Sequence, residues 1–197
     1  FEKLEGNPAM VGWIIALIGS ALVGFLVGAF PWWMAGMDPE KAPTTWPEVA
    51  LAAAKLKASG HKCPLTIAWQ GWTQLESFSA WHNVDFATKR NGLGGMDARL
   101  KFNSPLHVRH IENLANMAKS GLFVYKGREN KADATFVSGE CAMATASSAL
   151  AGSVKRNGKF GYGTGTLPYY PDVQGAPQKP IRAVSAGNCP FTRSIVS

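Results

Sequence analysis

The sequence predicts an α/β lobe preceded by one hydrophobic helix, and three observations support this fold class. No charged residue occurs from Met10 to Met34, whereas charges are spread fairly evenly after Asp38. Beyond that point, short apolar runs typical of strands alternate with segments of helical periodicity, as in α/β folds. The length of 197 residues suits one domain, with or without an appendage. We divide the chain into a hydrophobic segment over 1–34, a lobe over 35–180 and an irregular tail over 181–197.

The hydrophobic segment has the length of a membrane-spanning helix. Val11–Phe30 supplies the roughly 20 apolar residues that cross a bilayer, and tryptophans lie near both of its ends. A buried core helix and a cleaved signal peptide are the alternatives. Val27-Gly28-Ala29 resembles a small-residue cleavage site, although a basic region ahead of the apolar run is missing. We expect residues 10–34 to form a transmembrane anchor.

Start signals define the two longest helices of the predicted lobe. Thr45 is a good N-cap, and Glu48 three residues later completes a capping box for a helix that ends near Gly60. Ser104 followed by Pro105 predicts the start of a second helix. The apolar stripe predicted for this second helix consists of Val108, Ile111, Ala115 and Ala118, and the helix closes at Gly121.

Shorter elements complete the predicted lobe. The strands are expected over 63–69, 141–145 and 159–167, and the shorter helices over 72–81, 131–138 and from 148 to about 158. Residues 84–103 are expected to be a loop because of their glycines. From Pro168 onward the chain is rich in proline and glycine and shows no periodicity. The alternation of strands and helices is the basis for the α/β class.

Charge and cysteine usage exclude several functions. The net charge is +7, but basic residues occur as singles and pairs, which favours a solvated basic surface and no nucleic-acid partner. Three cysteines without a CxxC pattern argue against a structural zinc site or a thioredoxin motif. Cys63 and Cys141 could pair in an oxidising compartment, which leaves Cys189 without a partner.

Catalytic and cofactor signals are weak. No GxSxG or other activated-nucleophile pattern is present, so we expect no enzyme. The glycines of FGYGTGT lack the GxGxxG spacing of a dinucleotide site. His107 and His110 are three residues apart on a helix and could share a metal ion, but no third ligand is suggested. We expect solvated or capping roles for both histidines, no metal and no cofactor.

Two short stretches are candidates for ligand contact. Trp69 and Trp72 are separated only by Gln70 and Gly71, and dense aromatic rings form either a core or the wall of a ligand site. Ser147 lies where a strand turns into a helix, whose N-terminal amides favour an anion such as phosphate. Simple N-capping is the alternative for this serine, and core packing is the alternative for the two tryptophans.

Five stretches carry a resemblance to a known family. They read GMDPEKAPTTWPEVALAAAKLKASGHKC, WQGWTQLESFSAW, SPLHVRHIENLANMAKSG, FVSGECAMATASS and KFGYGTGTLPYYPDVQGAPQ. In order and separation they resemble the family-1 extracellular solute-binding proteins of ABC importers, in particular receptors for glycerol 3-phosphate. The resemblance runs from about Ala35 to about Gln178 and covers the middle portion of such a receptor. It implies a partial periplasmic-binding-protein-like lobe, mostly the second lobe of a hinge-closing fold.

The resemblance also implies a function. In that family the tryptophans of the WQGW motif wall the ligand cleft, which implies ligand contact for Trp69 and Trp72, and the first serine of the ASS turn implies it for Ser147. The implied ligand is a small phosphorylated polyol, sn-glycerol 3-phosphate or a glycerophosphodiester, which is passed unchanged to ABC permease subunits. We therefore expect a periplasmic protein, tethered to the inner membrane through residues 10–34.

Departures from the family pattern keep a second hypothesis open. The family's first lobe and its later tyrosine and arginine contacts lie outside the resembling stretch, and Ala183 and Val184 stand where paired glycines are expected. The alternative is a membrane-anchored structural or interaction protein, or a remnant of a receptor that binds no ligand.

Overall fold

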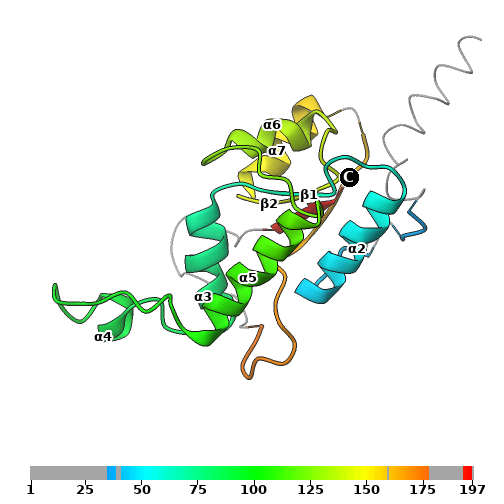
Figure 1. The fold of residues 1–197 in the computed structure, drawn as a ribbon. Helices are drawn as coiled ribbons and strands as arrows, with labels where there is room; N and C mark the ends of the chain where they lie inside the picture. Colours follow the sequence, from blue (N-terminus) through cyan, green and yellow to red (C-terminus); the bar gives the residue numbers. More distant parts are fainter. Residues whose placement is uncertain (1–34, 39–40, 159, 178–192, 197) are drawn as a thin grey trace, which may run out of the picture.

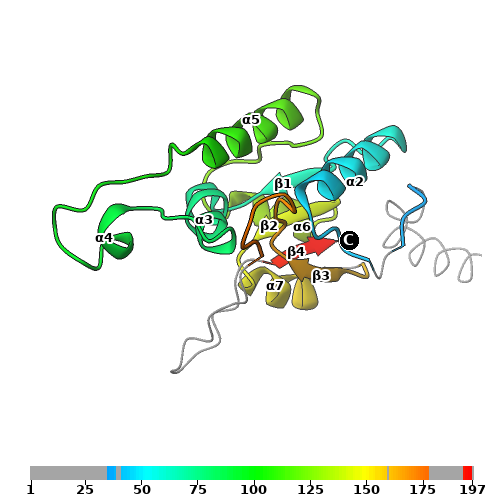
Figure 2. The same ribbon diagram turned by 90° about the horizontal axis from the view of Figure 1, so that it is seen from below.

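A computed structural model describes residues 35–38, 41–158, 160–177 and 193–196. In chain order the elements are α2 (Trp46–Ala58), β1 (Leu65–Ile67), the π-helical turn η1 (Trp72–Glu76), α3 (Ser77–Trp81), α4 (Thr88–Asn91), α5 (Pro105–Lys119), α6 (Lys131–Val137), β2 (Met143–Ala146), α7 (Ala149–Asn157), β3 (Gly163–Thr166) and β4 (Arg193–Val196). Helices lie on both faces of a central sheet (Figures 1 and 2). The predicted α/β class is confirmed.

Within the described residues, the sheet has four strands in the order β1-β2-β4-β3. β1 and β2 are parallel, with Leu65 opposite Met143, and β4 runs antiparallel to both β2 and β3. The sequence predicts an irregular tail over 181–197, and for Arg193–Val196 this is wrong because these residues form β4. Four residues are too few to show strand periodicity, whereas pairing on both sides satisfies their backbone hydrogen-bonding groups.

Two apolar cores cover the two faces of the sheet. One core joins α2, α3 and α5 to β1, and its largest fully buried members include Trp46 and Phe78. The other packs α6 and α7 against β2, with Phe136 and Leu150 at its centre. Figure 1 shows α2 and α5 on one side of β1 and β2, and α6 and α7 on the other. Parallel strands covered on both faces are buried along their length, as β1 and β2 are.

The predicted helix boundaries are confirmed where a cap defines them. The Thr45 hydroxyl accepts a hydrogen bond from the Glu48 amide at 3.3 Å, and the Glu48 carboxylate accepts one from the Thr45 amide at 3.1 Å. Ser104 caps α5, which Pro105 begins. Gly60 and Gly121 follow the two helices with φ of +94° and +68°, a conformation that glycine adopts at low cost.

The buried face of α5 differs from the predicted stripe. Val108 and Ile111 are each 47% exposed, whereas His107, His110, Leu114 and Met117 are buried. The expectation that the two histidines are solvated or serve as caps is therefore wrong for His110, and His107 is buried although it contacts the cap residue Ser104. Inside the core, the two imidazoles pack against aromatic rings and form hydrogen bonds with polar side chains. A prediction from hydropathy alone therefore assigns the wrong face of α5 to the core.

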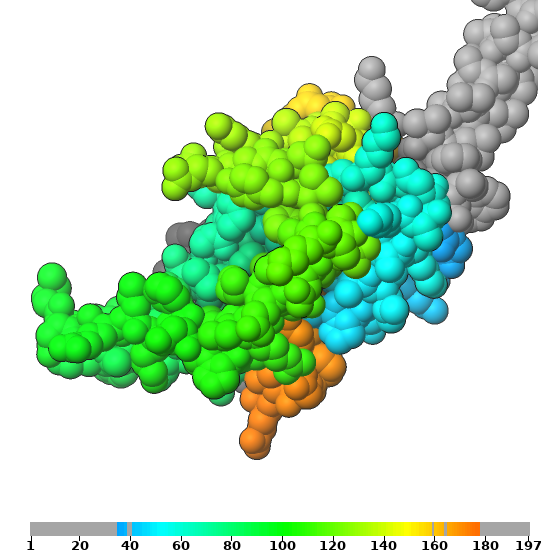
Figure 3. Space-filling model, viewed as in Figure 1, coloured from blue at the N-terminus to red at the C-terminus, as the bar shows by residue number. Residues whose placement is uncertain are grey.

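The segment between α3 and α5 projects from the body of the protein (Figures 1 and 3). This segment contains α4, in which Lys89, Arg90 and Asn91 have positive φ. The element is therefore a tight turn and not a regular helix. Stacking of Phe86 on Phe102 closes the base of the projection. The prediction of a loop over 84–103 is thus largely confirmed, because α4 is the one short element within it.

Residues 10–34, the expected transmembrane anchor, lie outside the described residues. Within the part of the chain that the structure describes, no helix is long and apolar enough to cross a membrane.

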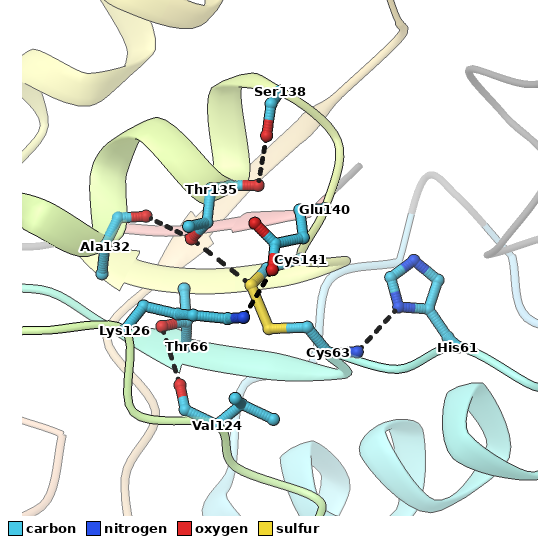
Figure 4. The surroundings of a disulfide bond; sticks show 10 residues. All are labelled: His61, Cys63, Thr66, Val124, Lys126, Ala132, Thr135, Ser138, Glu140 and Cys141. Carbon is cyan, nitrogen blue, oxygen red and sulfur yellow. Dashed lines mark hydrogen bonds and ion pairs between the residues drawn. A yellow bond between two sulfur atoms is a disulfide. The ribbon is translucent and has the colours of Figure 1, made fainter.

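A disulfide joins Cys63 to Cys141, the pairing that the sequence left open (Figure 4). The two Cα atoms are 4.6 Å apart, and each cysteine lies two residues before the start of its strand, β1 or β2. Beside the bridge, Lys126 forms an ion pair with Glu140. The amino ends of the two parallel strands are therefore linked covalently.

Candidate ligand-binding site

A pocket of about 310 Å³ lies beyond the carboxyl ends of β1 and β2. Its lining residues are Trp69, Trp72, Asn130, Asp133, Ser147 and Ala149. The chain that follows β1 supplies the tryptophans, the start of α6 supplies Asn130 and Asp133, and the start of α7 supplies the rest. In α/β folds, ligands bind outside the carboxyl ends of the strands. The structure thus brings together all three residues that the sequence selects, Trp69, Trp72 and Ser147.

The backbone holds Trp69 in an unusual conformation. Its φ of +53° is in the left-handed region, which non-glycine residues rarely adopt. The Trp69 amide donates to the Glu129 carbonyl at 2.8 Å, and the Trp69 carbonyl accepts from the Thr73 amide at 2.8 Å. The Gln70 side chain donates to two further carbonyls, at 2.7 and 3.0 Å. Two hydrogen bonds of Trp69 itself and two of the neighbouring Gln70 side chain therefore hold a strained residue in the lining of a pocket, as is typical of functional sites.

Trp72 begins a wide helical turn rather than an ordinary α-helix. Residues 72–76 form the π-helical turn η1, and such turns often occur at functional sites. Trp69 and Trp72 are each 37% exposed, so the alternative that they pack in the core is wrong. Gly71 between them has ordinary helical angles, and a Cβ there would meet nothing within 4 Å. Gly71 is therefore not needed for the close approach of another segment of the backbone.

Ser147 combines capping with exposure to the pocket. Its hydroxyl oxygen accepts a hydrogen bond from the Ala149 amide at 3.3 Å, which is the capping role that the sequence offers as an alternative. That bond leaves the hydroxyl proton available for a ligand oxygen. The neighbouring Ser148 makes no side-chain capping bond and does not line the pocket. Capping and ligand contact are thus compatible at Ser147.

Sequence reasoning did not select Asp133, the acidic residue of the pocket. It lies in the first turn of α6, three residues after the N-cap Asn130. Its Oδ1 atom is buried and has no hydrogen-bond partner among the described residues. Burial raises the pKa of the Asp133 carboxyl to about 6. The sequence shows Asp133 only as an acidic residue in the first turn of the helix predicted over 131–138. Because acidic residues are common there, where they stabilise the helix dipole, this position does not by itself indicate a ligand site.

A buried polar network joins the pocket to the core. Gln74, two residues after Trp72, donates to the Thr145 hydroxyl at 3.0 Å, and its Oε1 atom is 3.0 Å from His110 Nε2. His110 in turn lies 3.3 Å from the Tyr170 hydroxyl and stacks on Phe78 with ring centroids 4.0 Å apart. These contacts tie the turn that carries both tryptophans to β2 and to α5.

Burial keeps the histidines of this network neutral. It lowers the pKa of His110 to about 3, an effect that neighbouring His82 and His107 increase, and it also lowers the pKa values of those two. His107 lies 2.7 Å from both the Ser79 and the Ser104 hydroxyls. Among the described residues, no group of three or more histidine, cysteine, aspartate or glutamate side chains could hold a metal ion.

Comparison with known proteins identifies the family. A family model described as bacterial extracellular solute-binding protein matches residues 21–186. The chain belongs to this family. Its members bind solutes and are not enzymes, in agreement with the lack of an activated-nucleophile pattern. The resemblance on which the sequence prediction depends is confirmed.

Individual relatives of this solute-binding protein are closely similar over part of their length. The sn-glycerol-3-phosphate-binding periplasmic proteins of Escherichia coli K12 and Salmonella typhimurium LT2 are each 50% identical to it over 147 residues. That alignment covers 75% of this chain and 34% of each relative. The chain thus spans about a third of the length of the relatives it matches.

Solved structures confirm the fold as part of a periplasmic-binding-protein fold. The cyclic α-maltosyl-1,6-maltose binding protein from Arthrobacter globiformis matches with a TM-score of 0.57 and 20% identity, over 86% of this chain and 40% of that one. UgpB from Mycobacterium tuberculosis, solved in complex with glycerophosphocholine, matches with a TM-score of 0.57 and 18% identity, over 74% of this chain and 36% of that one.

Proposed function

We propose that this chain supplies one wall of the ligand cleft in the receptor of an ABC importer, and that its ligand is a small phosphorylated polyol such as sn-glycerol 3-phosphate. The observation that carries the proposal is the meeting of Trp69, Trp72 and Ser147 at one pocket. The 50% identity to receptors named for that ligand supports the choice of ligand.

The chemistry of the pocket suits such a ligand. Exposed indole faces pack against the C–H groups of a glycerol backbone and shield it from water. The Ser147 hydroxyl can donate to a phosphate oxygen while it accepts from the Ala149 amide. The pocket is also lined by Ala149, the first residue of α7, whose N-terminus favours negative charge. No bond of the ligand is made or broken in this role, which ends with delivery to permease subunits.

The disulfide supports a location outside the cytoplasm. Structural disulfides persist in oxidising compartments such as the periplasm, and Cys63 and Cys141 are fully buried partners in one. The relatives are named as periplasmic proteins. We place this chain in the periplasm as well, and we retain residues 10–34 as its proposed tether to the inner membrane.

Isothermal calorimetry with sn-glycerol 3-phosphate tests the proposal. Good sites bury 70–90% or more of a small ligand, whereas one wall buries less, so we expect a dissociation constant of about 1 mM. The changes Trp69→Ala, Trp72→Ala and Ser147→Ala should each weaken binding by about fivefold or more.

Matched controls are present in the same chain. Tyr125 is an aromatic residue with 57% exposure that does not line the pocket, and Ser148 is the neighbour of Ser147. Tyr125→Ala and Ser148→Ala should leave the affinity unchanged. Absence of binding by the folded chain, or equal losses from site and control variants, would instead support the structural or interaction protein, or the remnant that binds no ligand.

A further inference from the structure

The carboxyl ends of three helices meet at one end of the lobe, where β1 and β2 begin. α2 and α5 run side by side in the same direction (Figure 1), and Lys57 near the end of α2 donates a hydrogen bond to the Ser120 carbonyl just after α5. α7 follows β2 and leads to β3, and these two strands share one direction because both are antiparallel to β4. The carboxyl end of α7 therefore lies at this end as well.

Six exposed basic residues lie at this end of the lobe. Five of them are in the last turns of the three helices, and the sixth is in the segment between α2 and β1. In the sequence they occur as singles and pairs, and the fold brings them together. We call this surface the basic end, and its members are Lys55, Lys57, Lys62, Lys119, Lys155 and Arg156.

Acidic side chains do not neutralise the basic end. Among the described residues, Asp38 and Glu140 lie in the segments that reach it, and each pairs with a lysine outside the six. Asp38 pairs with Lys41, and Glu140 pairs with Lys126 beside the disulfide (Figure 4). None of the six forms an ion pair with a described residue. Their surplus of positive charge is comparable with the net charge of +7 of the whole chain.

The first described residues lie at the same end. Gly36 and Met37 line a surface hollow together with Lys55, and Ala35 and Met37 pack against the core that α2 shares with β1. In the sequence, Ala35 directly follows residues 10–34, the proposed membrane tether. Because no spacer separates the two, such a tether holds the basic end close to the lipid.

We infer that the basic end lies against the anionic phospholipid headgroups of the membrane. Lysine and arginine are attracted to an anionic lipid surface, and this attraction falls off within a Debye length of about 8 Å at physiological ionic strength. A hydrophobic anchor and a basic surface together hold a protein on a membrane more firmly than either alone. The inference rests on the tether that is part of the proposed function, and it adds a lipid partner and an orientation.

The orientation has a consequence for the ligand pocket. The pocket lies beyond the carboxyl ends of β1 and β2, whereas the basic end lies at their amino ends. With the basic end on the lipid, the pocket faces away from the membrane and stays accessible to solutes.

Stabilisation of helix dipoles is the alternative role for these charges. Lysine and arginine in the last turn of a helix interact favourably with its carboxyl end. That role does not explain Lys62, which is outside any helix, or the lack of acidic partners for the six. Only contact with lipid makes the surroundings of these lysines depend on the headgroup charge.

The test measures lysine acylation in the full chain, reconstituted in lipid nanodiscs and read by mass spectrometry. One set of discs contains phosphatidylcholine alone, and the other contains about 30% phosphatidylglycerol. We expect acylation of Lys55, Lys62 and Lys119 to be about fivefold slower in the anionic discs. About 0.5 M NaCl should remove most of this protection.

An exposed lysine at the other end of the lobe is the matched control. Lys131 lies in the first turn of α6, forms no ion pair with a described residue and should react equally fast in both discs. The double change Lys55→Gln and Lys119→Gln should reduce the protection of Lys62 to less than about twofold. Lys131→Gln should leave that protection unchanged. The melting temperature of each variant confirms that it folds.

The inference and the ligand proposal fail in different ways. Equal rates in both discs, or equal protection of Lys131, would overturn the inference. Equal rates are also the result expected if the six charges serve only helix dipoles, or if they bind an acidic protein surface. A chain that does not remain in either disc contradicts both the tether and the inference. None of these results changes the ligand affinity, which calorimetry measures separately.

Discussion

The two ends of the parallel strands β1 and β2 are built in opposite ways. At the amino ends, a disulfide between Cys63 and Cys141 ties the strands together, and the surrounding residues are well packed. At the carboxyl ends, Trp69 has a left-handed backbone conformation, a wide helical turn follows, and the buried Oδ1 atom of Asp133 has no hydrogen-bond partner among the described residues. Stabilising features thus gather at one end of the strands and destabilising ones at the other.

This contrast indicates where function is located. Strained backbone and unsatisfied polar atoms persist only where the surrounding structure holds them in place, and they cluster at ligand sites. Here the parallel register that the disulfide anchors at one end also fixes the separation of Trp69 and Ser147 at the other. The predictions below test the two ends in turn, from the largest expected effect to the smallest.

Removal of the disulfide should have the largest effect on stability. The bridge spans 78 residues, and closing a loop of that length stabilises a fold by about 4 kcal/mol. We expect the double change Cys63→Ala and Cys141→Ala to lower the free energy of unfolding by roughly this amount in urea titrations. Cys189→Ser is the matched control and should leave the free energy of unfolding unchanged under oxidising conditions. An equal loss in that control would show that the described bridge is not the stabilising one.

Acidification from pH 7 to pH 4.5 should lower the free energy of unfolding, because histidines that are buried and neutral in the fold must take up protons on unfolding. Burial lowers the folded-state pKa values of His61, His82, His107 and His110, so the unfolded chain binds more protons below about pH 6.5. Asp133 contributes the opposite slope, because its raised pKa favours proton binding by the folded chain as the pH falls through about 6. We expect the loss of stability from the four histidines to exceed the gain from Asp133. Urea titrations at several pH values measure the net change in the free energy of unfolding.

The change His110→Phe isolates the main contributor to this slope. It keeps the ring that stacks on Phe78 but removes the titrating group and leaves Gln74 Oε1 without its partner. The variant should be less stable at pH 7 yet show a flatter pH dependence. A slope as steep as that of the unmodified chain would contradict the assignment to His110.

The change Gln74→Leu should cost about 2 kcal/mol, because the Thr145 hydroxyl and His110 would lose a buried partner. Gln74 is itself buried and links the pocket turn to β2 and α5. Thermal unfolding measures the effect. Leu is close to Gln in volume, so a loss below about 0.5 kcal/mol would mean that the network contributes no stability.

Gly71→Ala should have the smallest effect and the opposite sign. The residue has helical angles with open space at its Cβ position, so alanine should stabilise the chain by about 0.5–1 kcal/mol. Thermal unfolding measures the gain. A loss of stability would show that the turn between the tryptophans needs glycine after all.

Local signals predicted much of the fold. The capping box at Thr45 and the Ser104-Pro105 start depend on a few adjacent residues, and the structure confirms both. The order of strands and helices in the lobe also follows from local periodicity. By contrast, β4 depends on pairing with two distant strands, and the buried face of α5 depends on rings from α3 and from Tyr170. Contacts between distant segments leave no local pattern.

Three lining residues of the candidate site could be predicted from the sequence, but its buried carboxylate could not. Trp69, Trp72 and Ser147 were selected from aromatic density, from a strand-to-helix turn and from the family resemblance, and they line one pocket. Asp133 was missed because an acid in the first turn of a helix is common, and only tertiary burial leaves its oxygen without a partner. The left-handed φ at Trp69 likewise depends on a hydrogen bond to Glu129, which lies 60 positions further along the chain.

A two-dimensional NMR titration of the tryptophan indole N–H groups with sn-glycerol 3-phosphate tests the central claim most directly. Resonances of Trp69 and Trp72, assigned from Trp69→Phe and Trp72→Phe variants, report on the pocket, and those of the buried Trp46 and Trp81 report on the core. We predict saturable shifts for Trp69 and Trp72 and none for the other two. Shifts confined to Trp46 and Trp81, or no shift up to about 10 mM ligand, would contradict a phosphorylated-polyol site at the carboxyl ends of β1 and β2.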